Sequence, residues 1–497
     1  MFTPSAVHPF EPLYQPRVLA SITCAALVLY VVAGFFTNQL HNIPGPWLPA
    51  LSSLPLFVQS LRGRRAMWIM QQHKKYGPVI RIAPNKVCVS ADEGVKMIYS
   101  NKAAKSHAYD AFRFKDVKMC IGLLDMKEAH ARRKALLPAF SRQNLVEMEP
   151  VIRRHLERFL EWLVKFEQEG VAIDVFKWFR YLTFDVITDI AFGQQIGMLE
   201  SEDNHFISQV ELRNKRNSLV GPFPFLLPLM RLLRMKLADD WIQADEEIAK
   251  YAIRARDGWA DSGPENRNRV DILARLEEAA KNNPNTSLTD KETIAEMMEI
   301  LNAGSDTTAN TAMFTTWELA SHPEIQNKLH KELVEAFPDP SKTLELEKLE
   351  KLPFLDGVCR EGLRLHAPIP SYLERIAPAK GLDIAGSHIP EGSLVGMQAY
   401  TNHRDGDVYP DPNAFVPERW SDPTAAMKLN FLPFSAGPRA CIGLNLANMQ
   451  LRIHLGHIFR RYRVIPAPHT TQDSMEHVEF FVIRPKSGKC DLYFRRV

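Results

Sequence analysis

The feature that most constrains this chain is a ten-residue stretch at positions 434–443, F-S-A-G-P-R-A-C-I-G. Its Gly-Pro pair predicts a tight turn. From Gly443 onward apolar residues recur every three or four positions, which predicts a helix that begins there. Cys441 therefore lies at a helix N-terminus, where the helix dipole stabilises an anion. Together with the charge of Arg439, this position favours the thiolate form of Cys441.

A lone thiolate limits the chemistry of this stretch. The sequence around Cys441 has no C-x-x-C partner and no histidine cluster, so zinc and iron–sulfur sites fail on ligand count. A single thiolate suffices as the axial ligand of haem iron. The alternative is a buried cysteine that packs as a small hydrophobe. The six cysteines show no paired spacing, which favours a reducing compartment over a disulfide framework: Cys24, Cys88, Cys120, Cys359, Cys441 and Cys490.

The stretch resembles the haem-binding signature of the cytochrome P450 family, F-x-x-G-x-R-x-C-x-G, at each fixed position. The resemblance extends over nearly all of the chain from Ile43 onward. It implies haem b as the cofactor, Cys441 as the axial ligand of its iron, and Phe434 and Arg439 as further haem-binding residues. It also implies a mainly α-helical cytochrome P450 fold with a small β part.

A second motif lies in a long predicted helix. The T-x-x-E spacing at Thr289 is typical of a capping box, and helical periodicity continues to His322. Residues 303–308 read A-G-S-D-T-T, which is poor helix chemistry and predicts a local bulge or groove. They resemble the family motif whose groove holds dioxygen over the haem. Thr307 would then hydrogen-bond the oxygen, and Asp306 would relay protons to it. The alternatives are a solvated or salt-bridged helix carboxylate for Asp306 and a packed core threonine for Thr307.

Two further motifs concern the scaffold around the cysteine. Glu361 and Arg364 form an E-x-x-R pair on one helix face. Residues 415–420, F-V-P-E-R-W, resemble the family's meander segment. The resemblance implies a buried network of Glu361, Arg364 and Arg419. We interpret this network as structural, because it would lock the loop that presents Cys441, and not as catalytic.

The haem carboxylates require cations. By resemblance, Arg133 and Arg375 would bind the propionates, and Arg439 would be a third such arginine. One departure from the family pattern lies at Ala129, where the family often has tryptophan. The alternative for Arg133 is a solvated basic helix face.

The N-terminal part contains 19 uncharged residues at positions 18–36, which as a helix would reach about 28 Å, close to the thickness of a bilayer core. A cleaved signal peptide is the alternative, but its apolar region is usually shorter. We therefore expect an N-terminal tail (1–17), a single transmembrane helix (18–36), a proline-rich hinge (37–50) and a haem-thiolate catalytic domain (51–497). The basic residues that follow the apolar segment predict a cytosolic catalytic domain at the endoplasmic reticulum membrane.

Two other segments carry local predictions. Residues 78–91 alternate around Pro84-Asn85, which predicts a β-hairpin. Residues 219–235 are strongly apolar and contain three prolines. They would either dip into lipid near the substrate entrance or pack in the interior.

Composition restricts the partners. The formal charge of +3 is too small to indicate nucleic acid binding. No flavin or dinucleotide glycine motif is evident, so electrons would come from a separate NADPH–cytochrome P450 reductase, with cytochrome b5 as a further candidate. Four basic residues could form its docking face: Arg132, Arg133, Lys134 and Arg452.

We therefore predict a membrane-bound haem-thiolate monooxygenase that oxidises a lipophilic small molecule. The chain resembles fungal microsomal members of the family that tailor secondary metabolites. One alternative is a haem-thiolate isomerase or dehydratase, which needs no external electrons. Another is a non-catalytic haem protein that senses a ligand. The Asp306–Thr307 pair argues against both, because neither needs proton delivery to dioxygen.

Overall fold

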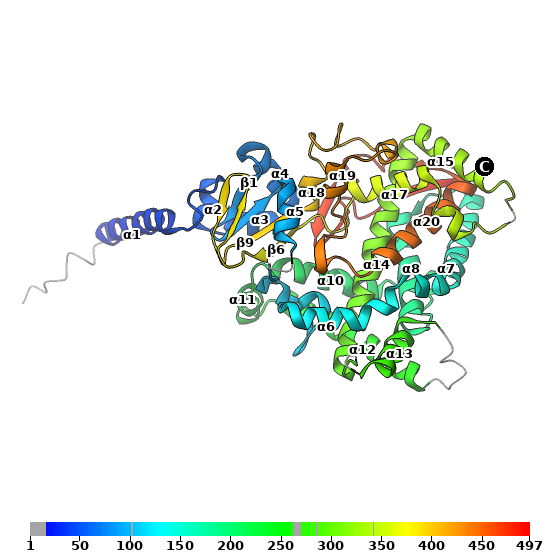
Figure 1. Ribbon diagram of the computed structural model, residues 1–497, viewed down its shortest axis with the longest axis horizontal. Coiled ribbons are helices and arrows are strands. Elements are labelled where there is room, and N and C mark those ends of the chain that lie inside the picture. Colours follow the sequence, from blue (N-terminus) through cyan, green and yellow to red (C-terminus); the bar gives the residue numbers. More distant parts are fainter. Residues whose placement is uncertain (1–15, 101–102, 262–269, 285–286, 341) are drawn as a thin grey trace, which may run out of the picture.

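The computed structural model describes residues 16–100, 103–261, 270–284, 287–340 and 342–497. Helices dominate, and the strands form one four-stranded sheet and several smaller ones, which confirms the mainly α prediction. In Figure 1 the larger sheet lies near α2 to α5, and helices form most of the rest of the molecule.

The helices are as follows: α1 (Pro16–Thr37), α2 (Trp47–Leu51), α3 (Leu54–Leu61), α4 (Arg65–Tyr76), α5 (Asp92–Ile98), α6 (Met126–Leu136), α7 (Arg142–Glu169), α8 (Val175–Phe192), α9 (Met198–Ser201), α10 (His205–Val220), α11 (Leu226–Leu232), α12 (Lys236–Asp261), α13 (Ile272–Asn282), α14 (Asp290–Ser321), α15 (Pro323–Ala336), α16 (Leu346–Leu349), α17 (Pro353–Leu365), α18 (Ala399–Asn402), α19 (Ala425–Asn430) and α20 (Leu444–Arg461). Short 3₁₀ turns that matter for the site are η2 (His107–Ala111), η3 (Cys120–Gly122), η6 (Pro417–Trp420) and η7 (Gly437–Arg439).

The strands are as follows: β1 (Val79–Ala83), β2 (Lys86–Val89), β3 (Arg113–Phe114), β4 (Val117–Lys118), β5 (Ile173–Asp174), β6 (Tyr372–Ile376), β7 (Leu382–Ile384), β8 (Ser387–Ile389), β9 (Leu394–Gln398), β10 (Tyr462–Pro466), β11 (His477–Phe480), β12 (Val482–Pro485) and β13 (Asp491–Arg496).

The four-stranded sheet has the order β1-β2-β9-β6. Strands β1 and β2 pair antiparallel, with Ile80 opposite Cys88, so the predicted hairpin at 78–91 is confirmed. Strand β9 pairs parallel to β2 and antiparallel to β6. Both faces of β1 and β2 are buried, because apolar side chains pack on each side. The sheet therefore holds β6, which carries Arg375, rigidly against the helical part.

The N-terminal segment begins with α1, which includes residues 18–36 and projects from the rest of the protein in Figure 1. Within the described part of the chain, no helix is both long enough and apolar enough to cross a membrane, so the predicted transmembrane helix is not confirmed. The proline-rich segment that follows packs on β1, where the Arg81 N–H donates to the Pro44 carbonyl at 2.7 Å. A Cβ atom at Gly45 would lie 2.4 Å from the Arg81 carbonyl oxygen, so glycine permits this close approach.

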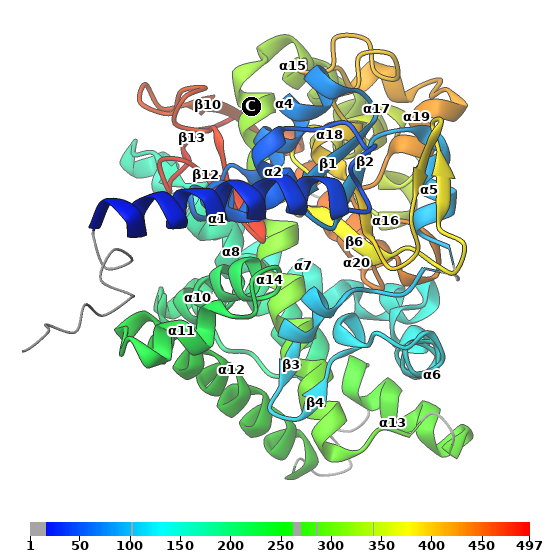
Figure 2. The same cartoon turned by 90° about the vertical axis from the view of Figure 1, so that its left-hand side faces the viewer.

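Helix α14 runs through the helical part and contacts α8, α12, α17 and α20 (Figure 1; Figure 2). Its N-terminus has the predicted capping box, with Thr289 and Glu292 bonded reciprocally. Gly304 lies against α8, where an added Cβ would be 2.6 Å from an Ile187 side-chain carbon. The helix is uninterrupted from Asp290 to Ser321, so of the two predicted possibilities, a bulge or a groove, the backbone bulge is wrong. The close packing on α8 supports the glycine and threonine residues that weaken an isolated helix.

Candidate functional site

The loop before α20 holds Cys441 in a fixed position. The Cys441 N–H donates to the Phe434 carbonyl at 2.9 Å, which closes the loop around η7. Gly437 has a φ of +70°, and a Cβ atom there would lie 1.9 Å from the Tyr99 carbonyl oxygen. Any other residue would therefore displace the loop. Helix α20 begins at Leu444, as predicted.

The environment of the Cys441 thiol is an interior hollow. The residue has exposed surface, yet burial among protein atoms raises the pKa of its thiol. A group that is both exposed and far from bulk water must face a space inside the protein. The backbone N–H of Gly443 and the charge of Arg133 lower the pKa, but burial is the larger effect. Burial thus opposes the predicted thiolate form, and Arg133 is a cation whose charge favours it.

One turn of α14 borders an interior hollow as well. Ala303 is exposed and Thr307 is half-buried, although the helix around them is buried. They lie four residues apart, so they share one face. The Thr307 hydroxyl donates to the Ala303 carbonyl at 2.7 Å, which is the back-bonding that the sequence predicts. This turn of α14 therefore provides a small, accessible wall with one hydroxyl group.

Asp306 is directed away from this wall. Its carboxylate accepts a hydrogen bond from Arg180 Nε of α8 at 2.9 Å and from the Asn214 amide of α10 at 3.2 Å. Arg180 also donates to Glu211 at 2.6 Å, whose side chain is 31% exposed. Burial raises the pKa of Asp306, and the charge of Arg180 opposes this. The structure thus places Asp306 in an ion-pair chain that reaches the surface, and it does not bring its carboxylate together with the Thr307 hydroxyl.

Three arginines predicted to bind propionates lie near one another. Burial lowers the pKa of Arg439, and the charges of Arg375 and Arg133 lower it further. Lys105, which the sequence did not indicate, joins them: burial and then Arg375 and Arg439 hold its pKa well below its usual value. Lys105 Nζ donates to the Ile121 carbonyl at 2.8 Å. Three arginines that lie close together in a partly buried site, with Lys105 beside them, fit a ligand with two carboxylates, as haem has.

The predicted scaffold residues are in direct contact. Arg364 donates two hydrogen bonds to the Glu361 carboxylate, at 2.7 and 2.9 Å, and Arg419 Nε donates a third at 3.0 Å. Glu361 and Arg364 are fully buried. Trp420 Nε1 and the Val416 N–H also donate to Glu361, each at 2.9 Å. The indole of Trp420 is a partner that the sequence analysis missed, although it lies within the quoted F-V-P-E-R-W motif.

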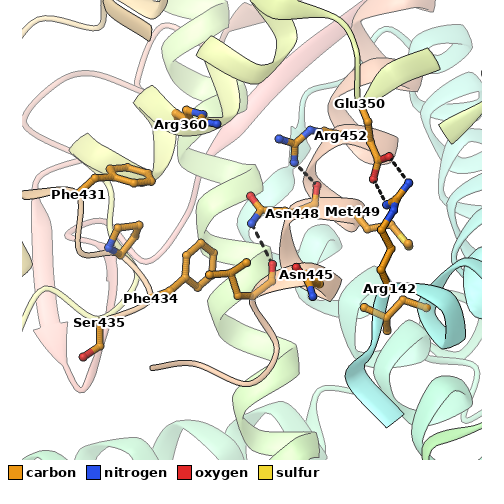
Figure 3. A pocket seen from close by; sticks show the side chains of 13 residues that line it. Arg142, Glu350, Arg360, Phe431, Phe434, Ser435, Asn445, Asn448, Met449 and Arg452 are labelled. Atoms are coloured by element: carbon orange, nitrogen blue, oxygen red, sulfur yellow. Dashed lines mark hydrogen bonds and ion pairs between the residues drawn. The ribbon is translucent and has the colours of Figure 1, made fainter. Parts of the chain in front are cut away.

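A surface pocket of about 390 Å³ lies behind the Cys441 loop (Figure 3). Phe431, Phe434 and Ser435 of the loop line one side, and the first turns of α20 line the other. Arg142 donates two hydrogen bonds to Glu350 across its rim, both at 2.6 Å. The pocket thus opens to the surface on the side of the loop that carries Phe434.

Fold and site together define a helical protein with a loop-held cysteine, a buried cation cluster and an accessible turn on its central helix, which suits a haem-thiolate protein. Residues 43–492 match the cytochrome P450 family, and the chain belongs to this family. A benzoate 4-monooxygenase from Aspergillus niger is 34% identical, covering 89% of this chain and 91% of its own. An averantin hydroxylase from Dothistroma septosporum is 30% identical over 92% of this chain and 88% of its own. A trichothecene C-4 hydroxylase from Trichoderma arundinaceum is 29% identical over 91% of this chain and 92% of its own.

Membership of this family makes the protein a monooxygenase with a haem cofactor, whose iron has an axial cysteine thiolate. The donor set fits that cofactor. The structure supplies a cysteine that faces an interior hollow, buried cations for two carboxylates, and a small wall on α14.

Proposed function

We propose that this chain hydroxylates a lipophilic small molecule in secondary metabolite biosynthesis, using dioxygen and electrons from a separate reductase. The observation that carries the proposal is that Cys441, held by its loop, and the Ala303–Thr307 turn of α14 both keep exposed surface, and that α14 contacts α20, the helix that follows the loop. Relatives named as benzoate 4-monooxygenase, trichothecene C-4 hydroxylase and averantin hydroxylase support hydroxylation.

In this proposal Cys441 holds the haem iron, and Phe434 packs beside the thiolate loop. Arg133, Arg375 and Arg439 hold the propionates. The bound haem supplies the iron centre at which dioxygen is activated. Glu361, Arg364 and Arg419 act at a distance by fixing the loop, and they do not touch substrate.

The proton-handling residues in this proposal are Thr307 and Asp306. The Thr307 hydroxyl lies on the accessible wall and can turn from the Ala303 carbonyl to an oxygen atom in the hollow. Asp306 is held by Arg180, which also binds Glu211 nearer the surface. Asp306, Arg180 and Glu211 line a narrow crevice, along which Asp306 would take protons from the surface. For Asp306 to serve Thr307, its carboxylate must leave Arg180 or act through water.

The reductase would dock at the pocket behind the Cys441 loop. Two basic residues predicted for this role are engaged elsewhere: Arg132 is bonded to Glu292 and Glu296, and Arg452 to Asp356. Their side chains are only 10% and 13% exposed. Two arginines at the rim of the pocket expose more of their charge, although both are also paired: Arg142, bonded to Glu350, is 56% exposed, and Arg360, bonded to Asp356, is 41% exposed.

Charge reversal tests this docking surface. Arg142→Glu with Arg360→Glu should reduce turnover supported by reductase and leave turnover supported by hydrogen peroxide unchanged, since peroxide needs no docked partner. Lys351→Glu is the matched control, because it reverses a 70% exposed charge on α16's C-terminal side. Equal reductase-supported turnover in the wild-type protein, the double variant and the Lys351→Glu control would count against this surface.

We also propose that the protein attaches to the endoplasmic reticulum membrane with its catalytic domain in the cytosol. Residues 18–36 carry no charge. On α11 and its flanks, Phe225, Leu229, Leu232 and Leu233 are 43 to 79% exposed, and Trp47 of α2 is 70% exposed. Exposed apolar side chains of this size favour contact with lipid over interior packing. Flotation with liposomes should fail after removal of residues 1–36 together with Leu232→Ser and Leu233→Ser; retention of binding would contradict the proposal.

The reaction itself can be tested with isotope-labelled dioxygen, NADPH and a purified reductase. Averantin and a trichothecene are the first substrates to test, given the names of two relatives, and benzoate, which is charged at neutral pH, serves as a comparison. One labelled oxygen atom in the product would support hydroxylation. Conversion that needs neither dioxygen nor NADPH would support the isomerase alternative.

A further inference from the structure

Glu299 occupies an unusual place on α14. It lies four residues before Ala303 and eight before Thr307, and therefore on the same face of the helix. Its side chain keeps 12% of its surface exposed, although burial among protein atoms raises its pKa to about 7. As for Cys441, a group that is exposed but remote from bulk water faces an interior space. Glu299 thus extends the accessible wall of α14 by one turn, about 6 Å.

Polar atoms next to Glu299 lack partners. Glu299 Oε2 lies 3.7 Å from Arg213 Nη2, and Asp245 Oδ1 lies 3.6 Å from Arg213 Nε, both too long for hydrogen bonds. Within the described chain, these two carboxylate oxygens and the Nε and Nη1 atoms of Arg213 are buried without a hydrogen-bond partner. Arg213 itself is fully buried. These atoms have no accessible surface, so an internal water or a small shift of the side chains completes their bonds, and only the exposed part of the Glu299 side chain can meet a ligand.

The charges around Glu299 select the kind of ligand. Arg213 of α10 faces Glu299, and Asp245 of α12 is bonded to Arg216, so two cations balance two carboxylates. Glu296, one turn earlier, is occupied by Arg132 and by the Cys120 N–H. Lys105 also acts on Glu299, but its own pKa is held well below its usual value. A charged ligand would add an uncompensated buried charge here, whereas a neutral ligand would not.

We propose that Glu299 is the polar anchor of the substrate pocket and that it binds a hydroxyl group, alcoholic or phenolic, of a lipophilic substrate. A hydroxyl group can donate a hydrogen bond to the Glu299 carboxylate and brings no charge of its own into the site. Arg213 is a positioning residue, since it lies behind the carboxylate and holds it. The hydroxyl would lie roughly one to two helical turns, about 6 to 12 Å, from the Ala303–Thr307 wall where oxidation takes place. This inference rests on the proposed hydroxylase function and adds its substrate class.

The test compares 4-phenylphenol with its methyl ether, 4-methoxybiphenyl, which cannot donate a hydrogen bond. Binding to the haem-loaded protein is measured by calorimetry and by the change in the Soret band. The wild-type protein should bind the phenol roughly tenfold or more tightly than the ether. This preference should grow between about pH 6 and pH 8, because the ionised Glu299 accepts a stronger hydrogen bond than the protonated form.

Two variants separate binding from positioning. Glu299→Gln should reduce the preference and make it independent of pH. Arg213→Gln should move the midpoint of the pH dependence upward, because Arg213 lowers the pKa of Glu299. Glu347→Gln, a 79% exposed carboxylate on α16, is the matched control and should behave as wild type. If a variant fails to fold, the wild-type protein still tests the inference, because its preference for the phenol should grow between about pH 6 and pH 8 and a constant preference would contradict the role of Glu299.

Equal binding of the two probes by the wild-type protein, or an unchanged preference in Glu299→Gln, would overturn the inference. A failure of the proposed function gives a different result. In that case the protein would lack a thiolate-type spectrum, or would oxidise no lipophilic compound with NADPH and reductase. A protein that has the spectrum and oxidises both probes, but without preference, would refute only the role of Glu299.

Discussion

Replacement of Glu361 by glutamine should remove much of the stability of the Cys441 loop. The carboxylate accepts five hydrogen bonds, three at Oε1 and two at Oε2, and both oxygens are buried. In either orientation, the glutamine NH₂ group would confront at least two donors. The guanidinium groups of Arg364 and Arg419 would also lose their common counter-charge. Removing one partner of a buried ion pair costs about 3 to 5 kcal/mol.

The assay is urea unfolding followed by tryptophan fluorescence, together with the ratio of haem to protein. A loss of about 3 to 5 kcal/mol is a large fraction of the roughly 5 to 15 kcal/mol typical of a folded domain, so haem content should fall as well. The matched control is Glu347→Gln, whose carboxylate is 79% exposed and should change neither quantity. A Glu361→Gln protein with normal haem content and a loss below about 1 kcal/mol would refute the structural role of this network.

Three further outcomes are expected. Gly437→Ala should abolish haem incorporation, because the added Cβ would collide with the backbone of Tyr99. Gly488 has a similar φ of +73° but no atom near its Cβ position, so the control variant Gly488→Ala should load haem. Equal haem loading in the two variants would contradict the packing argument. Thr307→Ala should raise hydrogen peroxide release per NADPH consumed, and Thr316→Ala, which removes the same kind of back-bond at a buried position, should not. Burial lowers the pKa of His454 to about 3. Between about pH 3 and pH 6.5, His454 is therefore protonated in the unfolded state but neutral in the native state. Stability should therefore fall with decreasing pH in this window by up to about 1.4 kcal/mol per unit, and His454→Leu should show a shallower fall in urea unfolding; an unchanged slope would argue against a neutral buried histidine.

Local patterns predicted much of the fold. The Thr289 capping box, the hairpin at 78–91 and the helix after Gly443 are each specified by a few neighbouring residues, and the structure confirms all three. The E-x-x-R and F-V-P-E-R-W motifs also led to the Glu361 network, whose members the structure brings together. Neighbouring residues determine the capping box, the hairpin and the helix, whereas the contact of Glu361 with Arg419, 58 positions away, is predicted only from the resemblance of the two motifs to those of the family.

Other features depend on contacts between distant segments. Asp306 turns to Arg180, which lies 126 positions earlier, and neighbouring sequence does not reveal this pair. The bulge predicted in α14 does not form, because packing on α8 outweighs weak helix propensity. Glu299 has no motif of its own. Only the folded chain shows that its side chain faces the hollow beside Arg213.

The most direct test of the account is the carbon monoxide difference spectrum of the reduced protein, measured beside that of Cys441→Ser. The account predicts a strongly red-shifted Soret band in the wild-type protein and its loss in the variant, because Cys441 supplies the thiolate ligand. A wild-type band at the position typical of histidine-ligated haem, or a red-shifted band that persists in Cys441→Ser, would contradict the assignment of Cys441.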